Sequence, residues 1–594
     1  MTRAPLRPLA PVLEARARGE NPDRIERAER RRRHEALRDR QRQRAESRLI
    51  TLAVMFCLLF GAVGMRMAAL AGSEVARASH SGGDSGIVAQ RADIVDRNGA
   101  ILATNLITHA LYAQPPLMVD KPRAARELAA IFPDMAAATL LERFTSDRKF
   151  IWLRRHLSPE QQQAVHDIGE PGLRFGPREM RLYPNGPLAA HVLGGAGFGR
   201  EGVAAAEIVG RAGVEKTFDA FLRDPAQGGQ PLALSIDLSV QAAMREVLDR
   251  GMEVTNARGA AAILMDVRTG EILAMVSLPD FDPNDRPAPQ TEGDPSESPL
   301  FNRAVQGLYE LGSTFKVFTA AMALEEGIVT PDTVIDIRGP LRWGKHRIED
   351  FHDLGRELSV TGIVVESSNI GTARLAQALG AERQQGYLDA LGLLDPTGIE
   401  LLEGGARPLY PRRWSELSTM TISYGHGLSA SPLHLAAGYA TIANGGHQVT
   451  PTLLRRNRPP PLGPAVISEQ TSRQVLTMLR QVVTEGTASF GEVAGYAVGG
   501  KTGTADKPMP RGGYYEDKVI ATFAAVFPVQ APRYVLVTMF DEGTVSALGE
   551  ARRTAGWTAV PVAAEIIRRA GPLLGLRPAV ESRAGPAVML ASGQ

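Results

Sequence analysis

The sequence predicts an α+β fold in which helices flank an antiparallel sheet and a long helical stretch separates its first strands from its last. Two strand-like runs, at 232–237 and 260–267, precede the helical stretch, with a short helix expected between them. Runs typical of strands return at 496–505, 518–528 and 533–540. Because strands from both ends of one region flank a helical insert, we expect the sheet to be completed late in the chain.

The helical stretch is predicted from apolar residues at helical spacing. Alanine-rich faces recur at 315–324, 360–379 and 433–442, and a last helix is expected at 559–569. The chain has 594 residues, whereas single cores stop growing at about 250–300 residues. We therefore expect two or three domains.

The amino-terminal segment combines a basic stretch with an apolar run. Residues 1–48 contain 15 arginines and 8 acidic residues, although the net charge of the whole chain is only +2. The apolar run at 49–71 contains Cys57, the sole cysteine. Since positive charge marks the cytoplasmic side, we predict a basic cytoplasmic tail, one uncleaved transmembrane anchor and an exported remainder. Arg30–Arg33 also fits a solvated or nucleic-acid-binding charge run, but the mildly acidic remainder argues against a nucleic-acid partner.

Composition marks further boundaries after the anchor. A Ser-, Gly- and Ala-rich segment is typical of a flexible linker, and the region after it alternates short strands and helices without a catalytic cluster. The predicted parts are a linker at 72–90, a noncatalytic domain at 91–231, a catalytic domain at 232–570 and a flexible tail at 571–594. With Cys57 in the anchor, the exported domains can hold no internal disulfide.

Ser313 and Lys316 are the candidate nucleophile and base. They form a Ser-x-x-Lys tetrad at the start of an apolar helix, so both side chains lie above one face. The free N–H groups and the positive dipole end of a helix start can stabilise an oxyanion. Lys316 must be neutral to act as a base, which burial beside a second cation would favour. The same tetrad at Ser146–Lys149 is interpreted as a chance match on a polar surface.

Ser367 and Asn369 form the second candidate motif, Ser-x-Asn, after a helical run. The hydroxyl can relay a proton, and the amide can bind a backbone carbonyl of a substrate. In isolation such residues are more often a polar helix end. Their position between the other two motifs favours a site.

The third motif consists of Lys501, Thr502, Gly503 and Thr504, in a strand pattern after two glycines. Small residues there let a peptide approach as an added strand. The cation and the two hydroxyls suit an anion, for which the terminal carboxylate of a substrate is the natural partner. The N–H of Thr504 is a candidate second oxyanion-hole donor, beside that of Ser313.

With these residues the chain resembles the penicilloyl-serine transferase superfamily, whose SxxK, SxN and KTG motifs it carries in that order. Over about residues 50–565 it is similar to class B penicillin-binding proteins. The similarity rests on RADIVDRNGAILA from Arg91, RLYPNGPLAAHVLG from Arg181, GVEKTFDAFL from Gly213 and TGEILAMVSLPDFDPN from Thr269. GTADKP and YYEDKVIATFAAVFP most resemble the septal type, often called FtsI or penicillin-binding protein 3.

The resemblance implies a peptidoglycan D,D-transpeptidase that uses neither metal nor cofactor and is inhibited by β-lactams at the same serine. It implies these roles: Ser313 as nucleophile, Lys316 as base, Ser367 as proton relay, Asn369 as substrate ligand, Lys501 as the cation that tunes the field, and Thr502, Gly503 and Thr504 as the strand that binds the carboxylate. The implied partners are stem peptides on lipid II-derived glycan strands, an FtsW-type glycosyltransferase and other division proteins. The implied location is the inner membrane at the septum, with the catalytic domain in the periplasm and residues 91–231 as a pedestal for those partners.

Three residues depart from the pattern of the class. Ala92 replaces a usual Gly, Leu311 replaces a common Pro, and His426 occupies the middle of a YGHG block. A Gly-rich stretch, LGGAGFGREG, departs from the dinucleotide-binding spacing, and His346 and His352 match no zinc pattern. Three rival functions remain open: a β-lactamase or β-lactam sensor, an elongation-type class B protein, and a noncatalytic division scaffold.

Overall fold

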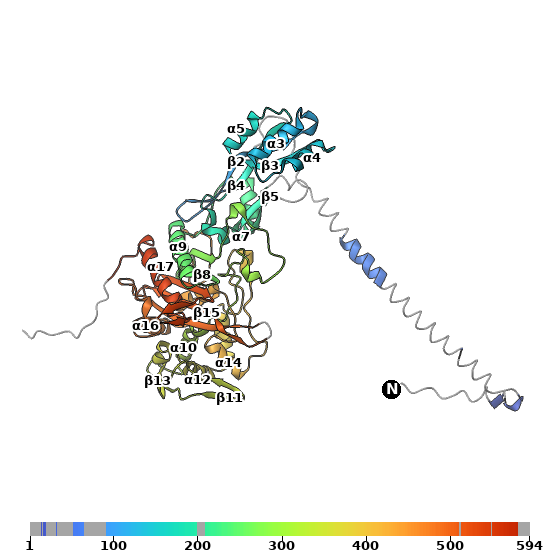
Figure 1. Ribbon diagram of the computed structural model, residues 1–594. Coiled ribbons are helices and arrows are strands. Elements are labelled where there is room, and N and C mark those ends of the chain that lie inside the picture. The colour runs from blue at the N-terminus through green and yellow to red at the C-terminus, as the bar shows by residue number, and fades with distance from the viewer. Residues whose placement is uncertain are drawn as a thin grey trace, which may run out of the picture. The chain divides into compact units, whose positions relative to one another are not determined.

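The computed structural model describes residues 13–14, 16–19, 31, 52–63, 91–198, 208–509, 512–547 and 549–579. The chain divides into two compact units, Met1–Gly86 and Ile87–Gln594 (Figure 1). In the first unit, residues 52–63 form a helix with exposed side chains. No helix in the described ranges has both the length and the apolar character needed to traverse a membrane.

Several predicted parts fall on residues outside these ranges. They are most of the tail at 1–48, much of the anchor at 49–71, the whole linker at 72–90 and the carboxyl-terminal tail beyond residue 579. The first part of that predicted tail is helical, because the last helix continues to Leu573.

The first part of the second unit is built on one sheet. Its strands follow the order β3-β2-β1-β7, and β4 also pairs with β2. The strands are β1 (Ile94–Val95), β2 (Ile101–Ala113), β3 (Ile151–Leu157), β4 (Leu173–Leu182) and β7 (Leu232–Ala233). The helices are α3 (Lys121–Ile131), α4 (Ala137–Thr145) and α5 (Pro159–Asp167). Alternate residues of β3, Ile151 and Leu153, join Leu128 and Phe144 of the helices in one core, as period two requires.

The prediction for residues 232–267 was wrong in two respects. Of the first predicted strand, 232–237, only Leu232–Ala233 is a strand, and it pairs in parallel with β1 rather than joining the catalytic sheet, whereas the second predicted strand is confirmed as β8 (Gly259–Asp266). The helix that follows, α9 (Leu238–Val254), is 17 residues long rather than short. Asp237 caps it by accepting hydrogen bonds from two backbone N–H groups. Buried residues such as Val240, Met244 and Leu248 repeat along one face, which favours the longer helix.

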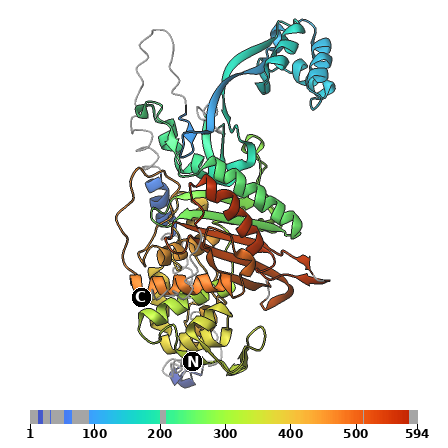
Figure 2. The same ribbon diagram turned by 90° about the vertical axis from the view of Figure 1, so that its left-hand side faces the viewer.

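The catalytic sheet is five-stranded and antiparallel, in the order β14-β15-β16-β8-β9. Its strands are β8 (Gly259–Asp266), β9 (Ile272–Leu278), β14 (Gly499–Pro508), β15 (Tyr514–Phe527) and β16 (Tyr534–Asp541). Helices α9 and α17 (Ala559–Leu573) pack together on it, and α15 (Pro432–Ala443) and α16 (Glu469–Thr484) contact it from the other side (Figure 2). The predicted α+β class and the late completion of the sheet are confirmed.

The helical insert lies between β9 and β14 in the chain. Its helices are α10 (Lys316–Glu325), α11 (Val360–Val365), α12 (Asn369–Leu379), α13 (Ala381–Ala390) and α14 (Glu416–Ser423). The run at 360–379, predicted as one helix, is two, because the backbone of Ser367 has a φ of 65°. A left-handed residue cannot continue a right-handed helix.

The remaining α-helices and strands of the second unit are short. They are α6 (Ala190–Leu193), α7 (Gly213–Thr217), α8 (Asp219–Arg223), β5 (Gly195–Phe198), β6 (Ile208–Ala212), β10 (Val334–Asp336), β11 (Leu341–Trp343), β12 (His346–Ile348), β13 (Glu357–Ser359), β17 (Val545–Ala547) and β18 (Glu550–Arg552).

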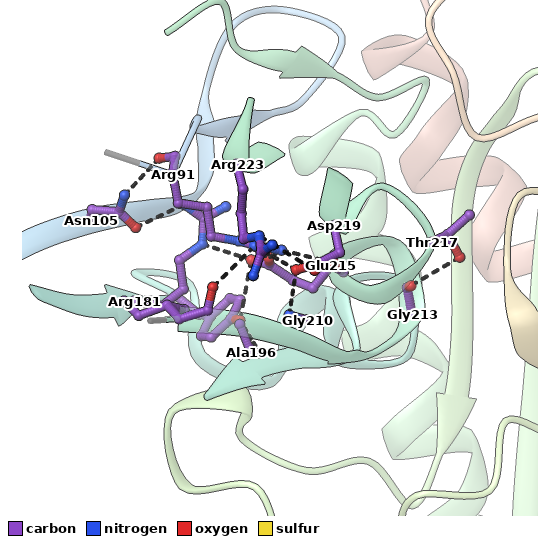
Figure 3. Close-up of polar contacts among 12 residues, drawn as sticks. Arg91, Asn105, Arg181, Ala196, Gly210, Gly213, Glu215, Thr217, Asp219 and Arg223 are labelled. Atoms are coloured by element: carbon purple, nitrogen blue, oxygen red, sulfur yellow. Dashed lines mark hydrogen bonds and ion pairs between the residues drawn. The ribbon is translucent and has the colours of Figure 1, made fainter. Parts of the chain in front are cut away.

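A buried charge cluster holds the sheet of the first part to the helices before β7 (Figure 3). The carboxylate of Glu215 is fully buried and pairs with Arg91 and with Arg181, each at 2.6 Å. The hydroxyl of Tyr183 donates to the same carboxylate at 3.2 Å. A buried carboxylate requires such partners, because desolvating an unpaired charge is very unfavourable.

Tyr183 also connects this cluster to the catalytic region. Its backbone N–H donates to the side-chain oxygen of Asn284 at 3.0 Å, and the amide of Asn284 donates to its carbonyl at 2.9 Å. The four sequence blocks that begin at Arg91, Arg181, Gly213 and Thr269 therefore meet at one joint.

Candidate active site

Ser313 and Lys316 lie on consecutive turns of one helical segment. Ser313 belongs to a short 3-10 helix, η7 (Gly312–Phe315), and Lys316 is the first residue of α10. The N–H of Lys316 donates to the carbonyl of Ser313. Since residues three apart eclipse one another in a 3-10 helix, the two side chains share one side of the segment. Ser313 is half-buried and Lys316 is 1% exposed.

Three glycines let separate backbone segments meet at this turn. A Cβ on Gly503 would lie 2.2 Å from the carbonyl oxygen of Leu311, and one on Gly425 would lie 2.0 Å from that of Gly312. Gly312 has a φ of 56°, and its own Cβ would lie 3.2 Å from the backbone nitrogen of Thr504. A side chain at Gly503 or Gly312 would push β14 away from η7, and one at Gly425 would push the segment after α14 away from η7. The absence of side chains brings the backbone N–H of Thr504 next to the turn that carries Ser313.

Two lysine side chains converge on Ser367. Its Oγ lies 3.1 Å from Nζ of Lys316 and 2.9 Å from Nζ of Lys501. Lys316 also donates to the backbone carbonyl of Ser367, and Lys501 donates to the carbonyl of Thr502 at 3.2 Å. The structure thus brings the first, second and third motifs together around one hydroxyl.

The surroundings of this group lower the pKa of both lysines. Burial, and then the charge of Lys501, hold the pKa of Lys316 well below its usual range, while Asp350 acts in the opposite direction. Burial alone lowers the pKa of Lys501 to about 7. A buried lysine that is neutral near pH 7 can accept the proton of a serine hydroxyl.

The strained backbone of Ser367 is part of the same arrangement. A non-glycine residue with positive φ is uncommon and costs about 1–3 kcal/mol, so it persists only where its surroundings enforce it. Here the two lysines and the start of α12 enforce it. Asn369, the first residue of α12, donates its side-chain N–H to the carbonyl of Glu349 at 2.8 Å, which fixes the amide at the end of the helix.

Asp350 positions the Ser-x-Asn motif, although no motif indicated it. Its carboxylate accepts from the backbone N–H groups of Asn369 at 2.5 Å and Ile370 at 3.1 Å, and from the hydroxyl of Ser368 at 2.8 Å. It therefore satisfies donors that the start of a helix leaves unpaired. The sequence offered only a loop rich in Asp and His, which did not distinguish this aspartate.

The hydroxyls of the two threonines in the third motif have different hydrogen-bond partners. Thr504 Oγ1 accepts from the N–H of Ala555 at 3.1 Å, so its own hydrogen can be donated elsewhere. Thr502 Oγ1 lies 2.8 Å from Oγ1 of Thr487, in the loop after α16, and one of this pair donates to the other. Thr487 is therefore a further residue of the site, which its own sequence context did not indicate.

The second Ser-x-x-Lys tetrad lies elsewhere. Ser146 caps the carboxyl end of α4 in the first part of the unit, where its hydroxyl donates to the carbonyl of Arg143 at 2.7 Å. Both Ser146 and Lys149 are exposed, in agreement with a polar surface.

Comparison with known proteins gives two family matches and close relatives. Residues 260–568 match the penicillin binding protein transpeptidase domain, and residues 86–230 match the penicillin-binding protein dimerisation domain. A protein of Caulobacter vibrioides named "Probable peptidoglycan D,D-transpeptidase FtsI" is 36% identical over 544 residues, which are 90% of each chain. The peptidoglycan D,D-transpeptidase FtsI of Escherichia coli is 31% identical over 485 residues, covering 76% of this chain and 79% of that one.

A solved structure has the same fold. Penicillin binding protein 3 of Mycobacterium tuberculosis, complexed with aztreonam, is 26% identical and has a TM-score of 0.63, with 83% of this chain and 98% of that chain covered. The same protein complexed with ampicillin gives a TM-score of 0.64. The two family matches, the extent of the relatives and the convergence of the three motifs lead to one conclusion: the chain belongs to the penicillin-binding proteins with a transpeptidase domain.

Proposed function

We propose that this chain is a peptidoglycan D,D-transpeptidase that cross-links stem peptides through an acyl-enzyme on Ser313 during septal cell-wall synthesis. Its relatives bear this activity in their names, and it shares their family and fold. The observation that supports the proposal most directly is the meeting of two buried lysines at the hydroxyl of Ser367, beside the turn of Ser313.

In the acylation step, neutral Lys316 takes the hydroxyl proton of Ser313, and Oγ attacks the carbonyl of the penultimate D-alanine. The N–H groups of Ser313 and Thr504 stabilise the resulting oxyanion. When the carbon–nitrogen bond breaks, the proton passes through Ser367 to the amine of the leaving D-alanine. A β-lactam would acylate the same oxygen.

Binding of the donor would involve the remaining motif residues. Asn369 holds a backbone carbonyl of the stem peptide. The hydroxyls of Thr502 and Thr504 hold its terminal carboxylate, and Gly503 allows the peptide to lie close to β14. Lys501 supplies positive potential while it is protonated, which favours an anionic terminus.

The cellular arrangement is part of the same proposal. Residues 1–48 would remain in the cytoplasm, 49–71 would anchor the chain in the inner membrane, and 72–90 would link the anchor to a periplasmic pedestal and catalytic domain at 91–231 and 232–570. The arginine-rich segment before an apolar run supports this orientation. The pedestal would receive an FtsW-type glycosyltransferase and other division proteins at the septum.

Mass spectrometry of the penicillin-treated protein tests the catalytic proposal. We expect one adduct on the peptide that contains Ser313, and none in a Ser313→Ala variant. An adduct at another residue, or no adduct on the folded protein, would contradict the proposal. Fluorescence imaging tests the cellular part: a septal band is expected, and uniform labelling of the side wall would indicate the elongation type instead.

A further inference from the structure

Three ring side chains pack together near the nucleophile and have no role in the acylation chemistry above. The ring centre of His426 lies 5.3 Å from that of Tyr424 and 6.0 Å from that of Tyr514. Tyr424 directly follows α14 and Tyr514 begins β15, so these residues join the helical insert to the sheet. We call the three residues the ring cluster.

The backbone of the ring cluster touches the segment that carries Ser313. Gly425, next to His426, has a φ of 85°, and a Cβ there would lie 2.0 Å from the carbonyl oxygen of Gly312. Gly312 directly precedes Ser313 in η7. His426 therefore directly follows a residue whose backbone contacts the turn that carries Ser313.

Glu310 fixes both sides of the ring cluster to the same segment. Its carboxylate accepts a hydrogen bond of 2.8 Å from the N–H of Gly427 and one of 3.1 Å from the hydroxyl of Tyr514. Burial raises the pKa of Glu310, and the two hydrogen bonds oppose this change. Because Glu310 lies three residues before Ser313, the ring cluster and the nucleophile share one rigid support.

Within the described ranges, Nδ1 of His426 is buried and has no hydrogen-bond partner. Burial, and then the positive charge of Lys316, lower the pKa of His426 to about 4, so the imidazole is neutral at physiological pH. An unpaired buried polar group costs about 1–3 kcal/mol, and folded proteins pair most such groups. The unused polar nitrogen, close to Lys316, is therefore available to a ligand.

We infer that the ring cluster is the subsite for the acceptor amine, the amino group of the second stem peptide, and that His426 orients this amine by accepting a hydrogen bond from it. The inference rests on the proposed function, because an acceptor is needed only after Ser313 has been acylated. The faces of Tyr424 and Tyr514 suit a group that arrives as an ammonium ion. A neutral imidazole offers one nitrogen lone pair to an N–H.

The step itself then balances without a proton on His426. The deprotonated amine attacks the ester carbon, a carbon–nitrogen bond forms, and the bond from that carbon to Ser313 Oγ breaks. The proton lost by the nitrogen passes through Lys316 to Oγ, which restores the serine hydroxyl. His426 acts as a positioning residue, since holding the nitrogen in line with the ester carbon reduces the entropy lost in the reaction.

The charged and titratable groups around the imidazole set its pH response. They are Lys316 on α10, Glu310 before η7, Tyr514 on β15 and Tyr424 on its own segment. As the pH falls toward 4, the imidazole of His426 takes up a proton. Its lone pair is then no longer available, and its positive charge repels the incoming ammonium ion. The reaction with acceptor should then fall more than the hydrolysis of the same acyl-enzyme.

The test measures how the acyl-enzyme partitions between aminolysis and hydrolysis. The purified protein is given an acyl-D-alanyl thioester as donor and D-alanine as acceptor amine, and the ratio of aminolysis to hydrolysis is measured. We expect His426→Phe to lower this ratio at least tenfold. His426→Asn, which keeps a hydrogen-bond acceptor, should stay within threefold of the unaltered chain, as should His166→Phe on the exposed face of α5.

Because both products arise from one acyl-enzyme, the ratio is independent of how fast Ser313 is acylated. A His426→Phe variant that keeps the ratio within twofold overturns the inference. Should that variant not fold, the imidazole ¹⁵N resonances of His426 in the penicillin-acylated native chain decide. A shift on adding D-alanine supports the inference, and no shift at concentrations that sustain aminolysis overturns it. Failure of penicillin to label Ser313 contradicts the proposed function instead.

Discussion

Lys316 and Lys501 approach the same oxygen atom, Oγ of Ser367, from a helix and from a strand, at 3.1 Å and 2.9 Å. Both side chains are almost completely buried, with exposed fractions of 1% and 0%. Two ammonium groups this close repel one another in a medium of low dielectric constant. The protonation states of Lys316, Lys501 and the hydroxyl of Ser367 are therefore coupled. Replacing one lysine changes the pKa of the other.

The first prediction concerns the charge of Lys501. Replacing it with glutamine removes a positive charge beside Lys316, so the pKa of Lys316 rises and acylation requires a higher pH. The acid limb of the pH profile of penicillin acylation should move to higher pH, with a loss of about tenfold at pH 7. Lys501→Arg keeps the charge and should leave the limb in place. A Lys501→Gln profile with an unmoved limb would show that the two lysines are not coupled.

Asp350 should act on the same profile with the opposite sign. Asp350→Asn removes a negative charge that raises the pKa of Lys316, so the acid limb should move to lower pH. The weaker cap of α12 should also lower the free energy of unfolding by about 1–2 kcal/mol. Asp353→Asn, in the exposed loop nearby, is the matched control, and both readouts should match the unaltered chain. Equal profiles for the two variants would rule out a role of Asp350 in the site.

Gly503 tests the close approach of β14 to η7. An added Cβ would lie 2.2 Å from the carbonyl oxygen of Leu311, so Gly503→Ala must displace the strand from the turn that carries Ser313. We expect penicillin acylation to slow by at least about a hundredfold, as for loss of an oxyanion-hole donor. Gly386→Ala, in α13 where nothing lies within 4 Å of the new Cβ, should acylate normally and gain about 0.5–1 kcal/mol of stability. Stopped-flow fluorescence and thermal unfolding measure the two effects.

Glu215 is expected to matter for stability rather than for chemistry. Glu215→Gln leaves Arg91 and Arg181 buried without a compensating charge, which should reduce the free energy of unfolding by about 3–5 kcal/mol. Glu127→Gln, on the exposed surface of α3, removes only a solvent-screened pair with Arg123 and should change stability by less than about 1 kcal/mol. Denaturant titration compares them. A Glu215→Gln variant as stable as the control would mean that the cluster contributes little to folding.

The motif residues could be predicted because each motif is contiguous in the sequence. Ser313 and Lys316 need only one helical turn to share a side, and Lys501 to Thr504 need only one strand. Two strongly apolar runs after the helical insert clearly indicated strands. We could therefore predict that the sheet is completed late in the chain. What the pattern could not give was the 3-10 turn at Ser313, which tightens the segment before α10 begins.

The residues that sequence patterns missed act across long separations. Asp350 reaches Asn369 over 19 positions through a loop whose composition resembles any polar turn. Thr487 meets Thr502 over 15 positions, from the loop after α16. The break between α11 and α12 has no proline or glycine to mark it, because tertiary contacts at Ser367 outweigh helical propensity there. Partner groups of this kind become visible only when the chain is folded.

The joint between Tyr183 and Asn284 has a practical consequence for handling the protein. A catalytic fragment that begins at residue 232 would lack the two hydrogen bonds between Asn284 and Tyr183, and it would lack β1, the strand with which β7 pairs. Surface that is buried in the intact chain would then be exposed to solvent. Such a fragment would expose normally buried surface and would tend to associate with other copies in solution. A protein for drug-binding or crystallisation studies should begin before Arg91 and should contain residues 91–231 and 232–570 in one chain.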